Sequence, residues 1–229
     1  MKILKIFILF LLIFSCSNNE QIAEFEKILG KENSQILTNL VQEFETDFLK
    51  RQYPELNTEK AYRQYLTELE NNSTGNWAKP SKKSREIFNK SKLRYEIYRI
   101  PDSVWIEKSP DTSHFKYDKS TVKTKWKYLN ENGEFEYGVS ESSISLNEPK
   151  NEDSIIELRK KYIDVNYVGK YRRALYSISK HNKFITEYLD MTDAVGILDP
   201  RMVAAKMLSN DVDLNNYFIK RLIVTEIAN

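Results

Sequence analysis

The stretch VGKYRRALYSISKHNKFITEYL, residues 168–189, decides the fold class. Its apolar residues recur at intervals typical of one helical face: Val168, Tyr171, Leu175, Ile178, Ile185 and Leu189. A surface helix that buries one side shows this period. The stretch therefore predicts helical structure packed against other elements.

The flanking sequence extends the same pattern in both directions. Asp199-Pro200 places a capping residue before a proline that suits the first helical position, and Asp213 is expected to cap a last helix. Upstream, Thr58 is expected to cap a helix that ends before the break at residues 71–76. The expected helices cover residues 33–51, 58–69, 84–95, 168–189, 200–208 and 213–222.

One stretch departs from the helical period. Val122, Thr124, Trp126 and Tyr128 alternate with lysines, and Phe135, Tyr137 and Val139 alternate with glutamates after a loop containing glycine. Alternation on both sides of such a loop predicts a β-hairpin. The predicted fold is mainly α, a multi-helix domain with one small antiparallel hairpin at about 122–139.

The loop length sets which hairpin side chains share a face. A four-residue loop, residues 130–133, pairs Trp126 with Tyr137 and Lys127 with Glu136, and we prefer it to a tighter turn that opposes two glutamates. An isolated hairpin is marginal in water, so a further strand or helix must support it. Residues 104–106, Val-Trp-Ile, are the candidate third strand.

The N-terminus predicts export. Lys2 and Lys5 precede an apolar run, residues 6–14, that is too short for a membrane span of about 20 residues and fits a signal peptide. The segment Ile13-Phe14-Ser15-Cys16 resembles the lipobox of bacterial lipoproteins. That resemblance implies cleavage between Ser15 and Cys16, lipid on Cys16 and a membrane-anchored protein.

The anchor predicts a location and a division of the chain. Ser17 lacks the aspartate that retains lipoproteins at the inner membrane, which favours the periplasmic face of the outer membrane over the inner membrane or the cell surface. We expect a signal peptide at 1–15, the lipidated cysteine and a short tether at 16–20, and a single mainly helical domain at 21–229.

Charge and cysteine content exclude several classes of function. Once Lys2 and Lys5 are removed, 33 basic residues face 33 acidic ones, and a neutral body argues against nucleic acid binding. Cys16 is the one cysteine, so no intramolecular disulfide forms. We expect no metal and no cofactor.

The two histidines do not indicate catalysis. His114 lies in a loop composition, and His181 falls on the helical stripe, where a packed and hydrogen-bonded side chain is expected. The carboxylates between Glu187 and Asp199 lack the spacing and central glycine of a calcium loop, so they are interpreted as caps and solvated turns.

Three hypotheses for function follow. The first is a non-enzymatic helical module that binds a protein partner in the cell envelope. The second is glycan binding by Trp126, Tyr128, Phe135 and Tyr137 on a solvent-facing side of the hairpin. The third is a hydrolase that uses two acidic residues about 5–10 Å apart.

Overall fold

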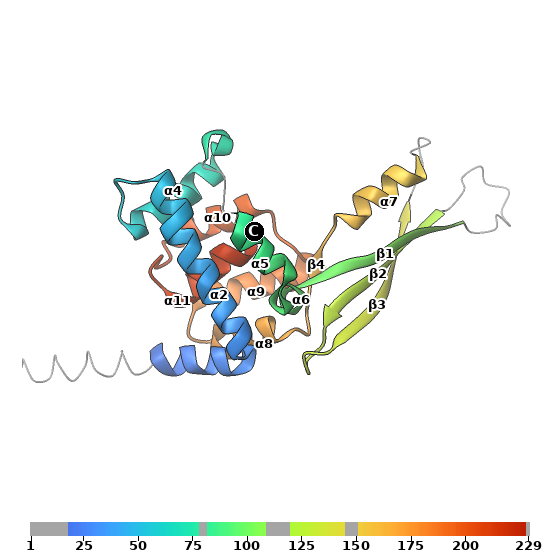
Figure 1. Cartoon of the computed structure of the whole chain (residues 1–229), viewed down its shortest axis with the longest axis horizontal. Coiled ribbons are helices and arrows are strands. Elements are labelled where there is room, and N and C mark those ends of the chain that lie inside the picture. The colour runs from blue at the N-terminus through green and yellow to red at the C-terminus, as the bar shows by residue number, and fades with distance from the viewer. Residues whose placement is uncertain (1–17, 78–81, 109–119, 145–150, 228–229) are drawn as a thin grey trace, which may run out of the picture. The chain divides into compact units, whose positions relative to one another are not determined.

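The computed structural model describes residues 18–77, 82–108, 120–144 and 151–227, and the chain divides into two compact units (Figure 1). Unit 1 contains the chain up to Arg94 and from Tyr171 onward, and unit 2 contains Tyr95–Lys170. The mainly helical fold class is confirmed. The single small hairpin is wrong, because the sheet has four strands.

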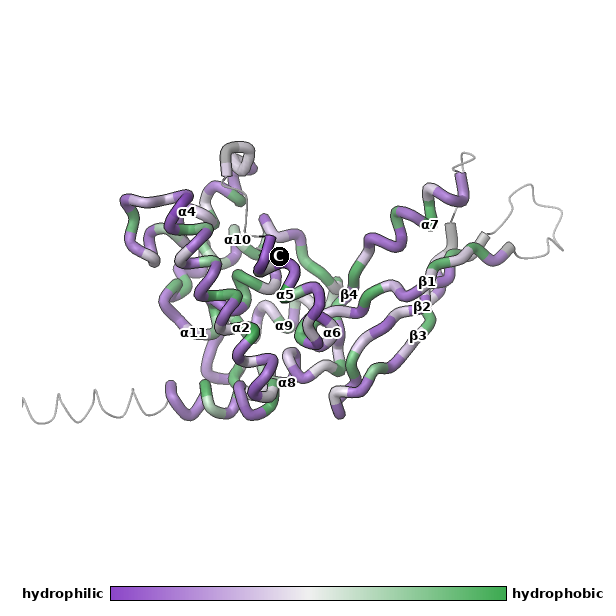
Figure 2. The backbone as a smooth tube through the Cα atoms, viewed as in Figure 1, coloured by the Kyte–Doolittle hydropathy of each residue, from purple (hydrophilic) through white to green (hydrophobic). Residues whose placement is uncertain are grey.

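Unit 1 is built from helices whose apolar residues face inward, and Figure 2 shows hydrophobic and hydrophilic residues alternating along them. Its elements are a helix at residues 18–29, α2 (Lys31–Glu43), η1 (Phe44–Leu49), α3 (Lys50–Gln52), α4 (Thr58–Glu70), η2 (Thr74–Asn76), α5 (Lys82–Lys90), α8 (Lys170–Ser179), α9 (Lys183–Val195), α10 (Pro200–Ser209), α11 (Tyr217–Leu222) and η3 (Ile223–Ile227). α6 (Lys92–Ile97) runs across the boundary into unit 2.

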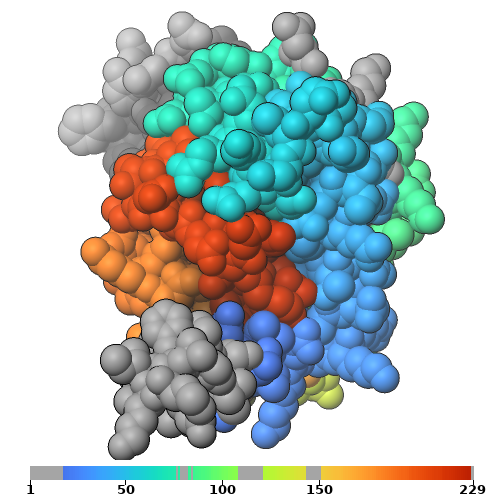
Figure 3. Space-filling model, turned by 90° about the vertical axis from the view of Figure 1, so that its left-hand side faces the viewer, coloured from blue at the N-terminus to red at the C-terminus, as the bar shows by residue number. Residues whose placement is uncertain are grey.

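The helix at residues 18–29 packs into the core of unit 1. Phe25 and Leu29 are fully buried, and the Phe25 ring lies 5.4 Å from the Phe218 ring and 6.2 Å from the Tyr171 ring, measured between centroids. Figure 3 shows this dark-blue helix directly beside the red C-terminal segment. Gly30 has φ 88°, a conformation that favours glycine, and it separates this helix from α2.

Several helix boundaries differ from the prediction because asparagines supply the caps. The stretch 168–189 is two helices, since Asn182 accepts a hydrogen bond from the Ile185 amide and starts α9. Asn57 caps α4 in place of Thr58, and Asn216 caps α11 in place of Asp213. The predicted cap at Asp199, with proline first in α10, is confirmed.

Unit 2 is an antiparallel sheet of four strands in the order β3-β2-β1-β4 (Figure 1). The predicted third strand at residues 104–106 is confirmed as part of β1, which is longer than expected. The elements are β1 (Tyr98–Lys108), β2 (Ser120–Leu129), β3 (Phe135–Ile144), α7 (Glu152–Lys160) and β4 (Asp164–Val165).

The predicted hairpin register is wrong by one residue. Leu129 pairs with Phe135, so the loop contains five residues, 130–134, and Trp126 pairs with Gly138 while Lys127 pairs with Tyr137. The Asn130 side chain accounts for the extra residue, because its Oδ1 accepts hydrogen bonds from the amides of Asn132 and Glu134. A shift of one residue moves every side chain of β3 to the other face.

Helix α7 covers one face of the sheet. Arg159 on α7 donates from Nε to Thr124 Oγ1 at 3.3 Å, and its guanidinium lies 6.0 Å from the Trp126 ring centroid. Thr124 is fully buried although it is polar. This hydrogen bond satisfies the Thr124 hydroxyl, which would otherwise be costly to bury.

A buried asparagine joins three segments of unit 2. The Asn166 side-chain amide donates to the carbonyls of Tyr95 and Leu129 at 2.8 and 2.7 Å. Next to it, an added Cβ at Gly169 would lie 2.0 Å from the Glu96 carbonyl oxygen, so the backbone approaches more closely here than any side chain allows. Both residues hold the 164–170 segment against the end of α6, and Asn166 also holds it against the end of β2.

No helix among the described residues is both long enough and apolar enough to cross a membrane.

Candidate functional site

The four aromatic residues proposed for binding lie on opposite faces of the sheet. Trp126 and Tyr128 are only 6% and 8% exposed, on the face that α7 covers. Phe135 and Tyr137 are 45% and 47% exposed on the opposite face. The expectation that all four rings form one solvent-facing platform is wrong, and its cause is the shifted register.

The exposed face, called the open face here, mixes apolar and cationic side chains. Trp105 and Val139 join Phe135 and Tyr137 on it, with exposures of 38% and 58%. The lysines of β2 lie between these residues. The open face is defined by Trp105, Lys123, Lys125, Lys127, Phe135, Tyr137 and Val139.

The lysines of the open face are neutralised or stacked on rings. Lys123 pairs with Glu107 and with Glu141, and Lys125 lies 3.4 Å from Asp102. Lys125 Nζ also lies 4.4 Å from the Tyr137 ring centroid, a cation–π distance. The open face is therefore close to neutral and rich in exposed apolar area, which is typical of protein interaction surfaces.

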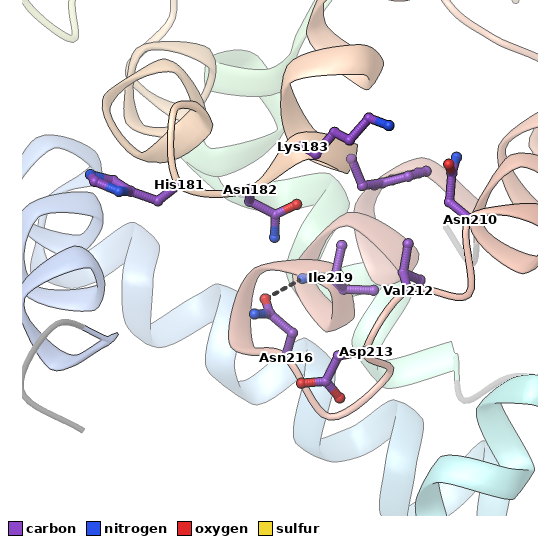
Figure 4. Close-up of a pocket in the computed structure, with 9 residues that line it drawn as sticks. His181, Asn182, Lys183, Asn210, Val212, Asp213, Asn216 and Ile219 are labelled. Atoms are coloured by element: carbon purple, nitrogen blue, oxygen red, sulfur yellow. Dashed lines mark hydrogen bonds between the residues drawn. The ribbon is translucent and has the colours of Figure 1, made fainter. Parts of the chain in front are cut away.

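A pocket of about 370 Å³ lies in unit 1 at the starts of α9 and α11 (Figure 4). Phe184 and Ile219 are its buried apolar residues. Its other lining residues come from the turn before α9, from the first residue of α9 and from the segment between α10 and α11: His181, Asn182, Lys183, Asn210, Val212, Asp213 and Asn216.

The pocket residues serve the local fold. Asn182 and Asn216 cap helices, and Asp213 accepts from the Asn215 amide. His181 is exposed in the turn between α8 and α9, so the expectation of a packed histidine is wrong. Asp213 is the one carboxylate in the lining, which contains no serine, threonine or cysteine. Among the residues that line the pocket there is therefore no hydroxyl or thiol nucleophile and no pair of carboxylates.

No protein family, curated protein or solved structure matches this chain.

Glu226, in η3 of unit 1, is a carboxylate with a strongly perturbed pKa. Burial raises the pKa of Glu226 to about 7, although hydrogen bonds from Tyr188 and Thr225 and the charge of Arg172 favour its ionised form. Arg172 is itself buried and donates to Thr192, to the Leu189 carbonyl and to Asp193. Arg172 and Thr192 are buried, whereas Glu226 is partly exposed and Asp193 is exposed, so this cluster extends from the interior to the surface of unit 1.

The structure tests neither the prediction that no metal is bound nor the predictions for the N-terminus. The described residues contain no group of three or more histidine, cysteine, aspartate or glutamate side chains arranged for a metal ion. Ser15, Cys16 and His114 lie outside the described residues.

Only part of the open face follows from the sequence pattern. The predicted binding residues included Phe135 and Tyr137, correctly as neighbours on one strand, but left out Trp105 and Val139. The signal for Trp105 was the Val-Trp-Ile run at 104–106, whose central residue must face away from its two neighbours in a strand.

Proposed function

We propose that this protein is a lipid-anchored envelope lipoprotein, without enzymatic activity, that binds a protein partner through the open face of its sheet. The observation that carries the proposal is the exposed apolar surface made by Trp105, Phe135, Tyr137 and Val139. Exposed apolar groups gathered on one face of a soluble unit mark interaction sites more often than single scattered ones do.

The anchoring half of the proposal rests on the N-terminal sequence. Cys16 follows a small residue and an apolar run, in the arrangement that resembles a lipobox. The described part of the helix, residues 18–29, is held in the core of unit 1 by Phe25 and Leu29, and its first described residue is two positions after Cys16. A lipid on Cys16 would therefore keep unit 1 at the membrane surface, the periplasmic face of the outer membrane by the sorting argument.

Glycan binding is less well supported by the same face. Stacking on a sugar needs a free ring face. Lys125 Nζ lies 4.4 Å from the centroid of Tyr137, and Lys127 Nζ lies 4.3 Å from that of Phe135, so a cation already covers one face of each ring.

A photo-crosslinking comparison tests the proposal. The full chain carries p-benzoylphenylalanine in place of Tyr137 on the open face, or in place of Tyr162, which is exposed elsewhere in unit 2. Irradiation of intact cells should give a discrete protein adduct with the Tyr137 variant and several times less with the Tyr162 variant. Equal labelling at both positions, or adducts with glycan alone, would refute partner binding by the open face.

A further inference from the structure

One edge of β3 faces no other strand among the described residues. β3 is the first strand of the sheet order, and only β2 pairs with it. Proteins usually protect a long edge strand with lysine, proline or a bulge. The ten residues Phe135–Ile144 contain neither lysine nor proline, and their register with β2 is continuous.

Both charged side chains of β3 have a partner within its own sheet, but only one of those partners is a cation. Glu136 Oε1 accepts a hydrogen bond from the Tyr128 hydroxyl at 2.9 Å, and Glu141 pairs with Lys123 at 3.1 Å. These two glutamates are the charged residues of the strand. Glu141 therefore has a cation beside it, whereas Glu136 keeps its charge, and pairing with a second strand of the same sequence needs a register that does not place Glu136 opposite another glutamate.

We infer that β3 pairs in antiparallel fashion with β3 of a second copy of this chain, about a two-fold axis at Gly138. The inference rests on the proposed function, because it names a second copy of the chain as the partner of the β3 edge that borders the open face. Two such sheets would form one continuous sheet with the open faces of both copies on the same side.

Backbone geometry restricts the register of this pairing. In each strand, the amide and carbonyl groups of alternate residues point to the same edge. In a symmetric antiparallel pair, a residue whose amide and carbonyl groups point to the free edge must lie opposite another such residue. The two-fold axis must therefore pass through a residue and not between two residues. That condition also excludes the register that would place Glu136 opposite Glu141.

Side-chain pairing selects Gly138 among the remaining centres. With the axis at Gly138, Tyr137 lies opposite Val139 of the second copy, and the reciprocal pair lies beside it. Aromatic and β-branched residues are favourable cross-strand partners. An axis at Val139 would instead oppose Tyr137 with a glutamate, and an axis at Tyr137 would shorten the paired segment to residues 135–139.

The same register provides an attractive charge contact. Phe135 lies opposite Glu141 of the second copy, and Lys127 Nζ lies 4.3 Å from the Phe135 ring centroid. Lys127 can therefore approach the carboxylate of the second copy. A seven-residue strand pair is a small interface, so we expect the dimer to be populated where lipid anchors concentrate the chains in a membrane.

Single thiols on β3 test the inference in membranes that contain the full chain. Gly138→Cys places a thiol on the axis, where paired Cα atoms about 5 Å apart are within disulfide range. Ser142→Cys is the matched control on the same strand, because its two copies would lie about 27 Å apart along the strands. Copper–phenanthroline oxidation should give a dimer band with Gly138→Cys alone, above the background of the unsubstituted chain.

A second pair of variants protects the test against misfolding at Gly138. Tyr137→Cys and Val139→Cys alter exposed positions, and co-expression of the two should give a disulfide dimer that neither gives alone. Dimers in neither experiment, or equal dimer yields from Gly138→Cys and Ser142→Cys, would overturn the inference. If a different protein is captured at Tyr137 while these dimers are absent, self-pairing fails and the proposed function stands.

Discussion

Replacing Asn166 with aspartate should strongly destabilise unit 2. The variant keeps the shape of the side chain but exchanges the Nδ2 amide for an oxygen. In the wild-type protein, the carbonyl oxygens of Leu129 and Tyr95 accept hydrogen bonds from this amide at 2.7 and 2.8 Å. The variant would place a carboxylate oxygen at these distances, where it has no hydrogen to donate. Asn166 is fully buried, so water cannot replace the lost donors.

The expected loss of stability follows from those two bonds. A buried polar group left without its partner costs about 1–3 kcal/mol, and two acceptors lose their donor here, so we expect a loss of about 3–5 kcal/mol at pH 7. A buried, unpaired aspartate has a raised pKa, because burial disfavours its charged form. The deficit should therefore shrink as the pH falls toward about 4, where the acid becomes protonated and can donate one hydrogen bond.

Urea unfolding followed by tryptophan fluorescence measures this change, since Trp105 and Trp126 belong to unit 2. Asn132→Asp is the control in the exposed hairpin loop and should shift the free energy of unfolding by no more than about 0.5 kcal/mol. The reasoning is wrong if Asn166→Asp behaves like this control at pH 7, or if its deficit does not depend on pH.

Three further predictions concern other parts of the chain. Gly169→Ala should cost at least about 2 kcal/mol, because the new Cβ meets the Glu96 carbonyl oxygen at 2.0 Å, whereas Gly75→Ala, with nothing within 4 Å, should be nearly neutral in the same urea assay. Glu226→Gln should flatten the dependence of stability on pH. The raised pKa of Glu226, about 7, means that the folded state binds the extra proton, so wild-type stability should fall as pH rises from about 4.5 to 7, and parallel curves for the two proteins would contradict this. Cys16→Ala should abolish metabolic labelling with a fatty acid and leave the signal peptide uncleaved at this site; continued labelling would refute the lipobox assignment.

The helical character of unit 1 was predictable because its amphipathic period is strong. The residues that cap the helices were harder to predict. Asn57, Asn182 and Asn216 cap helices at places where a nearby threonine, an unbroken stripe or an aspartate suggested otherwise. All of these residue types are good caps, and local sequence does not decide which one faces the helix start.

The open face could be predicted only in part, because one loop residue decides it. Alternation on both arms identified the hairpin, but Asn130 bonds to the amides of Asn132 and Glu134 and lengthens the loop to five residues. Trp126 then faces α7 while Tyr137 faces solvent. The unit boundaries fall inside α6, after Arg94, and after the first residue of α8, Lys170, where no glycine- or proline-rich linker marks them.

If Cys16 carries lipid, as proposed, the packing of the helix at residues 18–29 would limit how far unit 1 can reach from a membrane. From the Cα of Cys16 to that of the first described residue, the chain can span at most about 7 Å. With lipid on Cys16, unit 1 would have almost no freedom to extend away from the bilayer or to survey the space beyond it. Encounters would then depend on diffusion in the plane of the membrane, and a partner fixed to a more distant layer of the envelope would have to come to the protein.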